Sequence, residues 1–224
     1  MPSLYILIAA YNEAPVLDLV LTDVKRMAKS TLVVVDDGSS DKTSEIALQH
    51  TPHTLTHPIN CGKTAAIMTG IAYLKKINIP GDAIIILMDA DGQHDPSYIT
   101  QTVEMMQKYP QARVVMGIRE ITENTPLANK IGRMLADVTT YFYTGRWYTD
   151  SQCGYKAVRW NVLKTLSIQG DTYAFESQFL YHLAHMHIPH LTQSIPNIYT
   201  TYSTTKKHKQ GFLSGLLTLL SFIK

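Results

Sequence analysis

The stretch AIIILMDADGQHDP, residues 83–96, runs from a continuous apolar segment directly into a turn rich in carboxylates. The apolar part, residues 83–88, predicts a strand that is covered on both faces of a sheet. Asp89 and Asp91 follow at once, two residues apart. Two carboxylates that leave a buried strand repel each other and lose hydration unless a cation or a proton relieves them. The stretch therefore predicts a buried strand that ends in a cation-binding turn.

A divalent cation, Mg²⁺ or Mn²⁺, fits this turn. Mg²⁺ in proteins is commonly held by a few carboxylates together with substrate phosphates. Asp89 and Asp91 are the predicted ligands, and Gln93 offers a further neutral oxygen. The alternative is an ordinary acidic turn, in which Asp95 caps the next helix and the other carboxylates are solvated.

Around this stretch, short apolar runs alternate with segments of helical period. The expected strands are residues 4–10, 31–36, 83–88 and 112–118, with a weaker strand at 53–57. The expected helices are residues 13–28, 41–50, 63–77 and 96–108. Strands separated by helices of this length predict right-handed crossovers and a mostly parallel sheet with helices on both faces. The fold class is therefore α/β, in a single Rossmann-like domain.

The second half of the chain is more helical. Residues 126–143 and 175–187 predict helices, and residues 190–202 predict a strand. Two helix starts are expected at prolines, where Asp95 and Thr125 each precede a proline at the first helical position. The helix expected at residues 126–143 carries an apolar stripe at the helical period, formed by Leu127, Ile131, Met134, Leu135, Val138 and Phe142.

Polar and glycine residues follow the expected strands and do not precede them. They form the segments 10–13 (AYNE), 36–41 (DDGSSD) and 117–119 (GIR). Ligands of parallel α/β sheets bind outside the carboxyl ends of the strands, so these segments predict one binding edge. Carboxylates such as Asp36 and Asp37 can accept from a nucleobase N–H or a ribose hydroxyl. A capped turn of purely structural role is the alternative for each of them.

Composition narrows the class of protein. With 20 basic and 18 acidic residues the net charge is +2, which argues against a nucleic-acid-binding protein. Cys61 and Cys153 lie far apart in sequence, which favours a reducing compartment. The N-terminus lacks the pattern of a signal peptide, and no apolar stretch reaches the roughly 20 residues that span a bilayer. A cytoplasmic protein is expected.

The C-terminal segment, residues 206–224, is distinct from the catalytic domain expected at residues 1–205. It opens with a basic cluster and continues into residues 212–223, whose apolar side chains share one side of a helix. Such a segment suits a helix that lies on an anionic membrane leaflet, so a peripheral position at the cytoplasmic face is expected. Two alternatives stay open: a helix packed on the protein's own core, and a chain that continues into membrane-spanning segments.

Several motifs occur in an order and spacing that resembles glycosyltransferase family 2, in the branch that makes polyprenyl-phosphate sugars. They are residues 10–13 (AYNE), 34–41 (VVDDGSSD), 60–63 (NCGK), 89–96 (DADGQHDP), 117–119 (GIR), 150–156 (DSQCGYK) and 175–176 (FE). The resemblance covers roughly residues 3 to 205.

The resemblance implies a GT-A fold and a metal-dependent, inverting transfer from a nucleotide-diphosphate sugar. The residues that it implies for donor binding are Ala10, Tyr11, Glu13, Asp36, Asp37, Lys63, Asp89, Ala90 and Lys206. It implies Asp89, Asp91 and Gln93 around Mg²⁺ or Mn²⁺, and it gives the catalytic roles to Asp91, Arg119 and Arg133. Arginines at these two positions hold the acceptor phosphate in that branch.

The acceptor decides whether a base is needed. A phosphate monoester is already anionic and needs arginines to hold it, because a guanidinium binds phosphate through two N–H groups. Arg119 and Arg133 suit that role, although Arg133 could instead pair with Asp137 at helical spacing. A hydroxyl acceptor would need a general base, for which Asp150 and Glu176 are candidates; either could equally be structural.

The function expected from the sequence is transfer of a hexose from a UDP- or GDP-sugar to a polyprenyl phosphate of dolichyl or undecaprenyl type. Two alternatives remain: a family 2 enzyme with a hydroxyl acceptor on a glycan or lipid, and a non-catalytic protein that binds nucleotide sugars. The expected partners are the sugar donor, the lipid phosphate and a membrane surface, and a homo-oligomer is left open.

Overall fold

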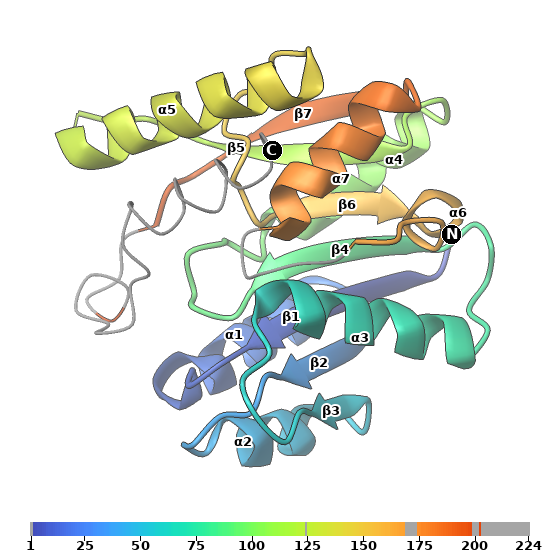
Figure 1. The fold of residues 1–224 in the computed structure, drawn as a ribbon. Coiled ribbons are helices and arrows are strands. Elements are labelled where there is room, and N and C mark those ends of the chain that lie inside the picture. Colours follow the sequence, from blue (N-terminus) through green and yellow to red (C-terminus); the bar gives the residue numbers. More distant parts are fainter. Residues whose placement is uncertain (1, 124, 169–173, 199–201, 203–224) are drawn as a thin grey trace.

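The structure is a computed structural model that describes residues 2–123, 125–168, 174–198 and 202. Within this part of the chain seven strands form one sheet in the order β3-β2-β1-β4-β6-β5-β7 (Figure 1). The strands are β1 (Leu4–Ala10), β2 (Thr31–Asp36), β3 (Thr54–Thr56), β4 (Ile84–Asp89), β5 (Val114–Arg119), β6 (Lys156–Arg159) and β7 (His190–Ile195). The helices are α1 (Ala14–Met27), α2 (Thr43–His50), α3 (Lys63–Lys76), α4 (Tyr98–Lys108), α5 (Leu127–Thr144), α6 (Trp160–Leu163) and α7 (Ala174–His185).

The sheet is mostly parallel, as expected. β2, β1 and β4 lie side by side with parallel strands, and β5 pairs with β7 in the same way. Alternate residues of β1 point to opposite faces, which produces two apolar cores. Leu7 joins the core beneath α3 and α7, whereas Ile6 and Ile8 join the core beneath α1 and α4. The sheet is therefore covered on both faces.

β6 and the short helix α6 were not expected from the sequence. β6 runs antiparallel between β4 and β5, where Lys156 pairs with Leu87 on one side and with Met116 on the other. Its four residues, KAVR, begin and end with a cation, so no apolar run or alternation marks a strand. Because β6 runs in the opposite direction, its first residue lies near the carboxyl ends of its neighbours. The loop before β6 is thereby carried to the binding edge.

The two helix starts predicted at prolines were wrong. α4 begins at Tyr98, because Pro96 forms a turn in which its carbonyl accepts from the Ile99 N–H. α5 begins at Leu127, and Pro126 is the residue before the helix, with an extended ψ of 137°. β7 ends at Ile195, seven residues before the end of the expected strand.

α5 lies where the sequence predicts a helix, but most of its apolar stripe is exposed, and only Leu135 and Val138 are half-buried. The exposed fractions of Leu127, Met134 and Phe142 are 71%, 56% and 77%. The buried residues of this helix are instead Asp137, Thr140 and Thr144. In the described part of the chain no helix is both long and apolar enough to cross a membrane.

Candidate active site

The turns after β1 and β2 are joined by hydrogen bonds at the carboxyl edge of the sheet. The Asn12 backbone N–H donates to Ser39 Oγ at 2.9 Å, and the Ser40 N–H donates to Asn12 Oδ1 at 2.9 Å. The Glu13 N–H donates to Thr43 Oγ1 at 2.8 Å. Asn12 has a φ of 53°, which asparagine tolerates better than most residues. The two turns therefore form one connected platform.

Asp36 shapes the second of these turns. Its Oδ1 accepts from the Ser39 N–H at 3.1 Å and also from the Ser39 hydroxyl. Gly38 has a φ of 70°, and a Cβ there would lie 2.4 Å from the backbone carbon of Ile59. The Asp36 carboxylate thus stabilises the turn, in agreement with the alternative of a structural role. Its contact with the sugar donor stays a prediction.

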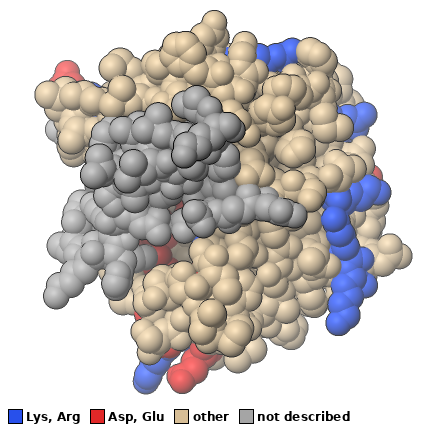
Figure 2. All heavy atoms as spheres, in the orientation of Figure 1, with Lys and Arg blue, Asp and Glu red and all other residues tan. Residues whose placement is uncertain are grey.

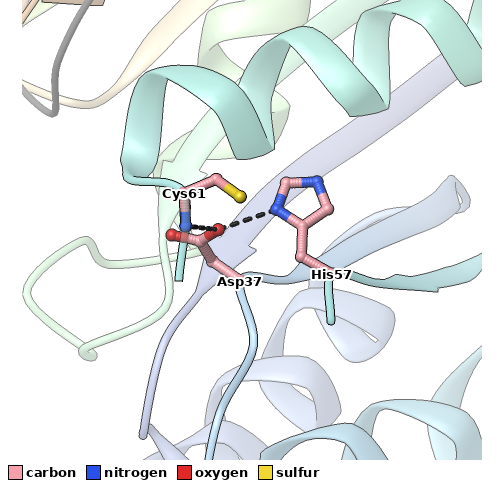
Figure 3. Close-up of side chains that lie close together, drawn as sticks. All are labelled: Asp37, His57 and Cys61. Carbon is pink, nitrogen blue, oxygen red and sulfur yellow. Dashed lines mark hydrogen bonds and ion pairs between the residues drawn. The ribbon is translucent and has the colours of Figure 1, made fainter. Parts of the chain in front are cut away.

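Asp37 connects the same turn to the start of α3 (Figure 3). Its Oδ1 accepts from His57 Nδ1 at 2.7 Å and from the Cys61 N–H at 2.9 Å, while its Oδ2 accepts from the Gly62 N–H at 2.7 Å. A carboxylate offers about four acceptor positions, so about one remains for a ligand.

Asp37, His57 and Cys61 also lie close enough to form a group of metal-ligand type. His57, however, is hydrogen-bonded through both ring nitrogens, with Nδ1 bound to Asp37 and Nε2 lying 2.9 Å from Thr69 Oγ1. The hydrogen bonds account for the cluster without a metal. It holds the loop before α3 against β2.

Asp89, at the end of β4, is bound to a lysine that the sequence places 26 residues earlier. Lys63 Nζ lies 2.6 Å from Asp89 Oδ1 and 2.8 Å from Glu176 Oε1. These three residues come from the first turn of α3, the last position of β4 and the first turn of α7. No spacing in the sequence indicates this bridge, because the three elements meet only through the packing of both helices on the sheet.

The two aspartates of the acidic turn differ in pKa. Burial opposes ionisation of Asp89, but the charge and hydrogen bond of Lys63, together with other nearby cationic groups such as Lys156, outweigh it and hold the Asp89 pKa well below its usual range. Burial and the negative charge of Asp89 raise the pKa of Asp91 to about 6. Asp91 is therefore a carboxylate in need of a cation, and the turn fits a divalent ion. The oxygens of Asp89 and Asp91 suit such an ion.

The backbone packs closely around this turn. Gly92 has a φ of 76°, and the Gln93 N–H donates to Asp91 Oδ1 at 3.0 Å. A Cβ on Gly154, in the loop before β6, would lie only 2.2 Å from Asp89 Oδ2. The loop before β6, a strand that the sequence did not predict, thus packs its backbone against the Asp89 carboxylate.

His94 lies beneath the turn. It is 3% exposed, and its Nδ1 accepts from the Asp89 backbone N–H at 3.3 Å. Burial lowers the pKa of His94 to about 4, so the ring is neutral at physiological pH. A neutral ring in this position supports the end of β4 and adds no positive charge to the site.

Arg119 and Arg133 lie together beyond β6. Arg119 donates from Nε and Nη2 to the two oxygens of Asp150, at 2.9 and 2.7 Å. Arg133 donates from Nη1 to the Arg119 carbonyl at 2.5 Å, and its Nε lies 3.7 Å from Asp150. Asp137, the alternative partner of Arg133, accepts instead from the backbone N–H groups of Asp150 and Ser151.

A cavity of about 710 Å³ connects these arginines with the acidic turn. Gln93, Arg119, Arg133 and Asp150 all line it, and residues of α5 form one wall. Burial opposes ionisation of Asp150, but its bonds from Arg119 lower its pKa. Asp150 is therefore an ionised partner of the arginines.

The remaining predicted donor residues lie around β1 and β4. Ala10 and Ala90 are each 2% exposed, so a ligand would meet their backbone and not their side chains. Tyr11 follows β1 and is partly exposed. Tyr202 donates its hydroxyl to the Asn12 carbonyl at 2.8 Å, which brings position 202 to the same edge. Lys206 and the C-terminal segment 206–224 lie outside the described residues.

Sequence reasoning missed the role of the loop between α5 and β6. Lys156, the first residue of β6, is 2% exposed and donates from Nζ to the Cys153 carbonyl. Burial lowers the pKa of Lys156, and its charge acts on Asp89 and on Glu176. A lysine next to a tyrosine gives no signal of burial in the sequence, because only the insertion of β6 between two strands encloses it.

Comparison with solved structures shows the fold. Glucosyl-3-phosphoglycerate synthase from Mycobacterium tuberculosis, in complex with uridine diphosphate, has a TM-score of 0.74 at 17% identity, over 99% of this chain and 80% of that one. Other structures of that enzyme contain Mn²⁺ with UDP-glucose and phosphoglyceric acid, or Mg²⁺ with UDP. The GT-A fold is thus confirmed.

Comparison of sequences shows the family. The chain is 34% identical over 212 residues to an uncharacterised protein of Methanocaldococcus jannaschii, which covers 91% of this chain and 84% of that protein. It is 29% identical over 187 residues to a UDP-N-acetylglucosamine–dolichyl-phosphate N-acetylglucosaminyltransferase of Methanococcus voltae, over 74% of this chain and 73% of the relative. A model of Glycosyl transferase family 2 matches residues 5–167. Since this match spans most of the 224 residues and includes the acidic turn, the chain belongs to glycosyltransferase family 2.

Proposed function

We propose that this glycosyltransferase moves a hexose from a UDP- or GDP-sugar to a polyprenyl phosphate, with inversion at the anomeric carbon. The observation that carries the proposal is the cavity shared by Gln93 of the acidic turn and by Arg119 and Arg133. An anionic acceptor held by the arginines would lie beside the turn that would hold the donor diphosphate. Two guanidinium groups in one partly buried cavity suit a phosphate better than a neutral hydroxyl.

The state of the candidate bases supports the same acceptor. Asp150 is bound through both oxygens to Arg119, and Glu176 is paired with Lys63. A hydroxyl acceptor needs a carboxylate that is free to take its proton, whereas a phosphate acceptor does not. Both carboxylates are better placed to orient a cationic side chain than to act as a base.

The donor end of the site would be organised by the acidic turn. Asp89 and Asp91 would hold Mg²⁺ or Mn²⁺, with Gln93 beside them, and the ion would neutralise the departing diphosphate. Lys63, which is paired with Asp89, adds a positive charge beside the acidic turn. Asp37 keeps about one acceptor position that a nucleobase N–H could use. The relative from Methanococcus voltae, named for a UDP-sugar donor and a dolichyl-phosphate acceptor, supports this assignment.

The test is a transfer assay with labelled donors. The full chain is incubated with UDP- or GDP-hexoses and a short-chain polyprenyl phosphate dispersed in detergent, with Mn²⁺, Mg²⁺ or excess chelator. We expect a lipid-linked sugar phosphate, identified by its mass, that forms only with a divalent ion. Transfer to a polyprenol or glycan hydroxyl with none to the phosphate would contradict the proposed acceptor.

Arg133→Gln tests the arginine pocket directly. Since Arg133 would hold the acceptor phosphate, we expect KM for the polyprenyl phosphate to rise about tenfold or more, with little change in KM for the donor. Arg26→Gln on α1 is the matched control, because Arg26 is exposed and pairs only with Asp23 in the described contacts. An unchanged acceptor KM in Arg133→Gln would remove this residue from the acceptor site.

A further inference from the structure

α5 has the opposite polarity to a helix packed on a soluble core. Leu127, Ile131, Met134 and Phe142, at spacings of four, three and eight residues, lie on its outer side with exposed fractions from 45% to 77%. A surface helix of a globular protein normally turns such a stripe toward the core. In Figure 2 the upper edge of the molecule, where Figure 1 shows α5, is mainly uncharged.

The inner side of α5 is held by hydrogen bonds and small side chains. Asp137 accepts two backbone N–H groups, at 3.0 and 2.8 Å from the Asp150 and Ser151 nitrogens. Arg133, on the same helix, donates from Nη1 to the Arg119 carbonyl of β5. A helix anchored through polar atoms does not need its apolar stripe for attachment. The stripe is therefore available for a partner.

Aromatic side chains extend the exposed stripe at its C-terminal end. Tyr141 packs against both Phe142 and Trp147, with ring centroids 5.8 and 6.2 Å apart. The exposed fraction of Trp147 is 57%. Tryptophan and tyrosine favour the boundary between lipid tails and water, because the rings are apolar and carry one polar group. Exposed apolar side chains that cluster in this way favour an interaction site.

The charges next to the stripe argue against two possible partners, the C-terminal segment and a second copy of the stripe. From Leu127 to Trp147 the chain has three cations and one carboxylate, and that carboxylate, Asp137, is buried. Residues 203–224 have four lysines and no acidic residue, so this segment and a second copy of the stripe both bring like charge. Two exposed acids on the preceding loop, Glu120 and Glu123, weaken the positive field, which leaves apolar insertion as the main attraction.

We propose that the outer face of α5 inserts into the boundary region of an anionic lipid bilayer. Leu127, Ile131, Met134, Phe142 and Trp147 would enter the level of the upper acyl chains, with Lys130 and Arg146 at the headgroups. The cavity that contains Arg119 and Arg133 has α5 as one wall, so this seating would open the cavity at the lipid surface. The inference concerns binding to lipid and needs neither the proposed donor nor the proposed acceptor.

The test uses the fluorescence of Trp147. The chain has two tryptophans, and Trp160 is 4% exposed in the core, so Trp160→Phe isolates the signal of Trp147. The full chain is mixed with vesicles of phosphatidylglycerol and phosphatidylcholine whose acyl chains are brominated. No sugar donor or polyprenyl phosphate is added. We expect a blue shift of the Trp147 emission and quenching by the acyl-chain bromines.

Matched variants separate insertion from a change of charge. Leu127→Glu/Phe142→Glu is expected to lower the vesicle partition coefficient about tenfold or more, because two anchors are lost and two negative charges are added. Leu19→Glu/Leu48→Glu likewise replaces two exposed apolar side chains with glutamate, on α1 and α2, at the opposite end of the molecule in Figure 1. We expect the control to lower partition about twofold or less.

Three results would overturn the inference. Vesicle binding without quenching of Trp147 would assign the membrane contact to another segment, such as residues 206–224. If iodide fails to quench Trp147 in the absence of vesicles at every protein concentration, the chain itself covers α5. If iodide fails to quench Trp147 only at high protein concentration, a second copy of the chain covers α5. The transfer assay in detergent contains no bilayer, so it tests the proposed function independently of bilayer binding.

Discussion

The Asp91 carboxylate is partly buried two residues from a second carboxylate, and both effects oppose its ionisation. They raise its pKa from 3.8 to about 6. The unfolded chain therefore loses this proton at lower pH than the folded protein. Between about pH 4 and pH 6 the folded state binds more protons, so the contribution of Asp91 to stability falls as pH rises and stays low above pH 6.

Asp91→Asn is accordingly expected to stabilise the metal-free protein. At pH 7.5, in chelator, we expect the free energy of unfolding in urea to rise by about 1–3 kcal/mol, and by little at pH 4. The same variant should lose metal-dependent transfer. Asp95→Asn is the control, because the amide oxygen can still accept the Ser97 N–H that Asp95 accepts at 2.9 Å. A less stable Asp91→Asn protein at pH 7.5 would contradict the pKa assignment.

Lys63 neutralises two carboxylates that are otherwise enclosed by the fold. Removing one partner of a buried ion pair leaves uncompensated charge. Since Lys63 and Asp89 have side chains about 30% exposed, we expect Lys63→Met to lower the free energy of unfolding by about 2–3 kcal/mol, less than for a fully buried pair. Chemical denaturation measures this change.

The double variant Lys63→Met/Glu176→Gln distinguishes the bridge from simple packing. Glu176 is 2% exposed, so neutralising it should recover part of the lost stability. If the effects of the two changes simply add, the ion pair is not a stabilising unit. In either case the charge balance around Asp89 is a property of three residues that lie far apart in sequence.

The residues of the acidic turn could be read from the sequence because they are contiguous and follow an apolar strand. Their pKa values could not be read in this way. Asp89 and Asp91 have the same side chain and the same turn, yet Lys63 lowers the pKa of one and burial raises the pKa of the other. The difference arises from residues brought near by α3 and α7.

At the scale of elements, β4 and the loop before β6 meet without a side chain between them. Gly154→Ala would place a Cβ 2.2 Å from Asp89 Oδ2 and displace that carboxylate. We expect metal affinity to fall about tenfold or more, although both aspartates remain. Gly81→Ala is the control, because a Cβ there meets nothing within 4 Å. Titration with Mn²⁺ measures the difference, and unchanged affinity would show that Asp89 can move without cost.

The regular βαβ units were predicted well because their apolar runs and helical periods are local. β1 and β2 have the expected bounds, and α3 ends one residue before the expected end. β6 was missed because four residues that begin and end with a cation carry no periodic signal. The outward orientation of the α5 stripe was not apparent either, since periodicity gives the face but not its partner.

At the scale of the whole molecule, the acidic turn and the nucleotide end of the site are attached to one continuous sheet. Binding of a nucleotide sugar with Mn²⁺ should therefore stabilise the entire fold. At a ligand concentration about 100 times Kd the gain is about 2.7 kcal/mol, which corresponds to roughly 5–10 °C in Tm for a chain of this size. A thermal-shift screen of UDP-, GDP- and dTDP-sugars measures this gain.

The metal dependence of that shift is the informative control. With excess chelator the shift should fall by more than half, since the donor diphosphate would then meet the charges of Asp89 and Asp91 without an ion. An equal shift with and without the metal would mean that the acidic turn does not take part in donor binding.

The sequence alone determined the α/β class, the mostly parallel sheet, the carboxyl edge as the binding edge and the acidic turn. Each of these depends on periodicity or on neighbours in the chain, which are local properties. The tertiary structure decided the Lys63 bridge to Asp89 and Glu176, the antiparallel β6 that delivers Gly154, and the exposure of the α5 stripe. These depend on contacts between residues far apart in sequence, which exist only once the helices have packed on the sheet.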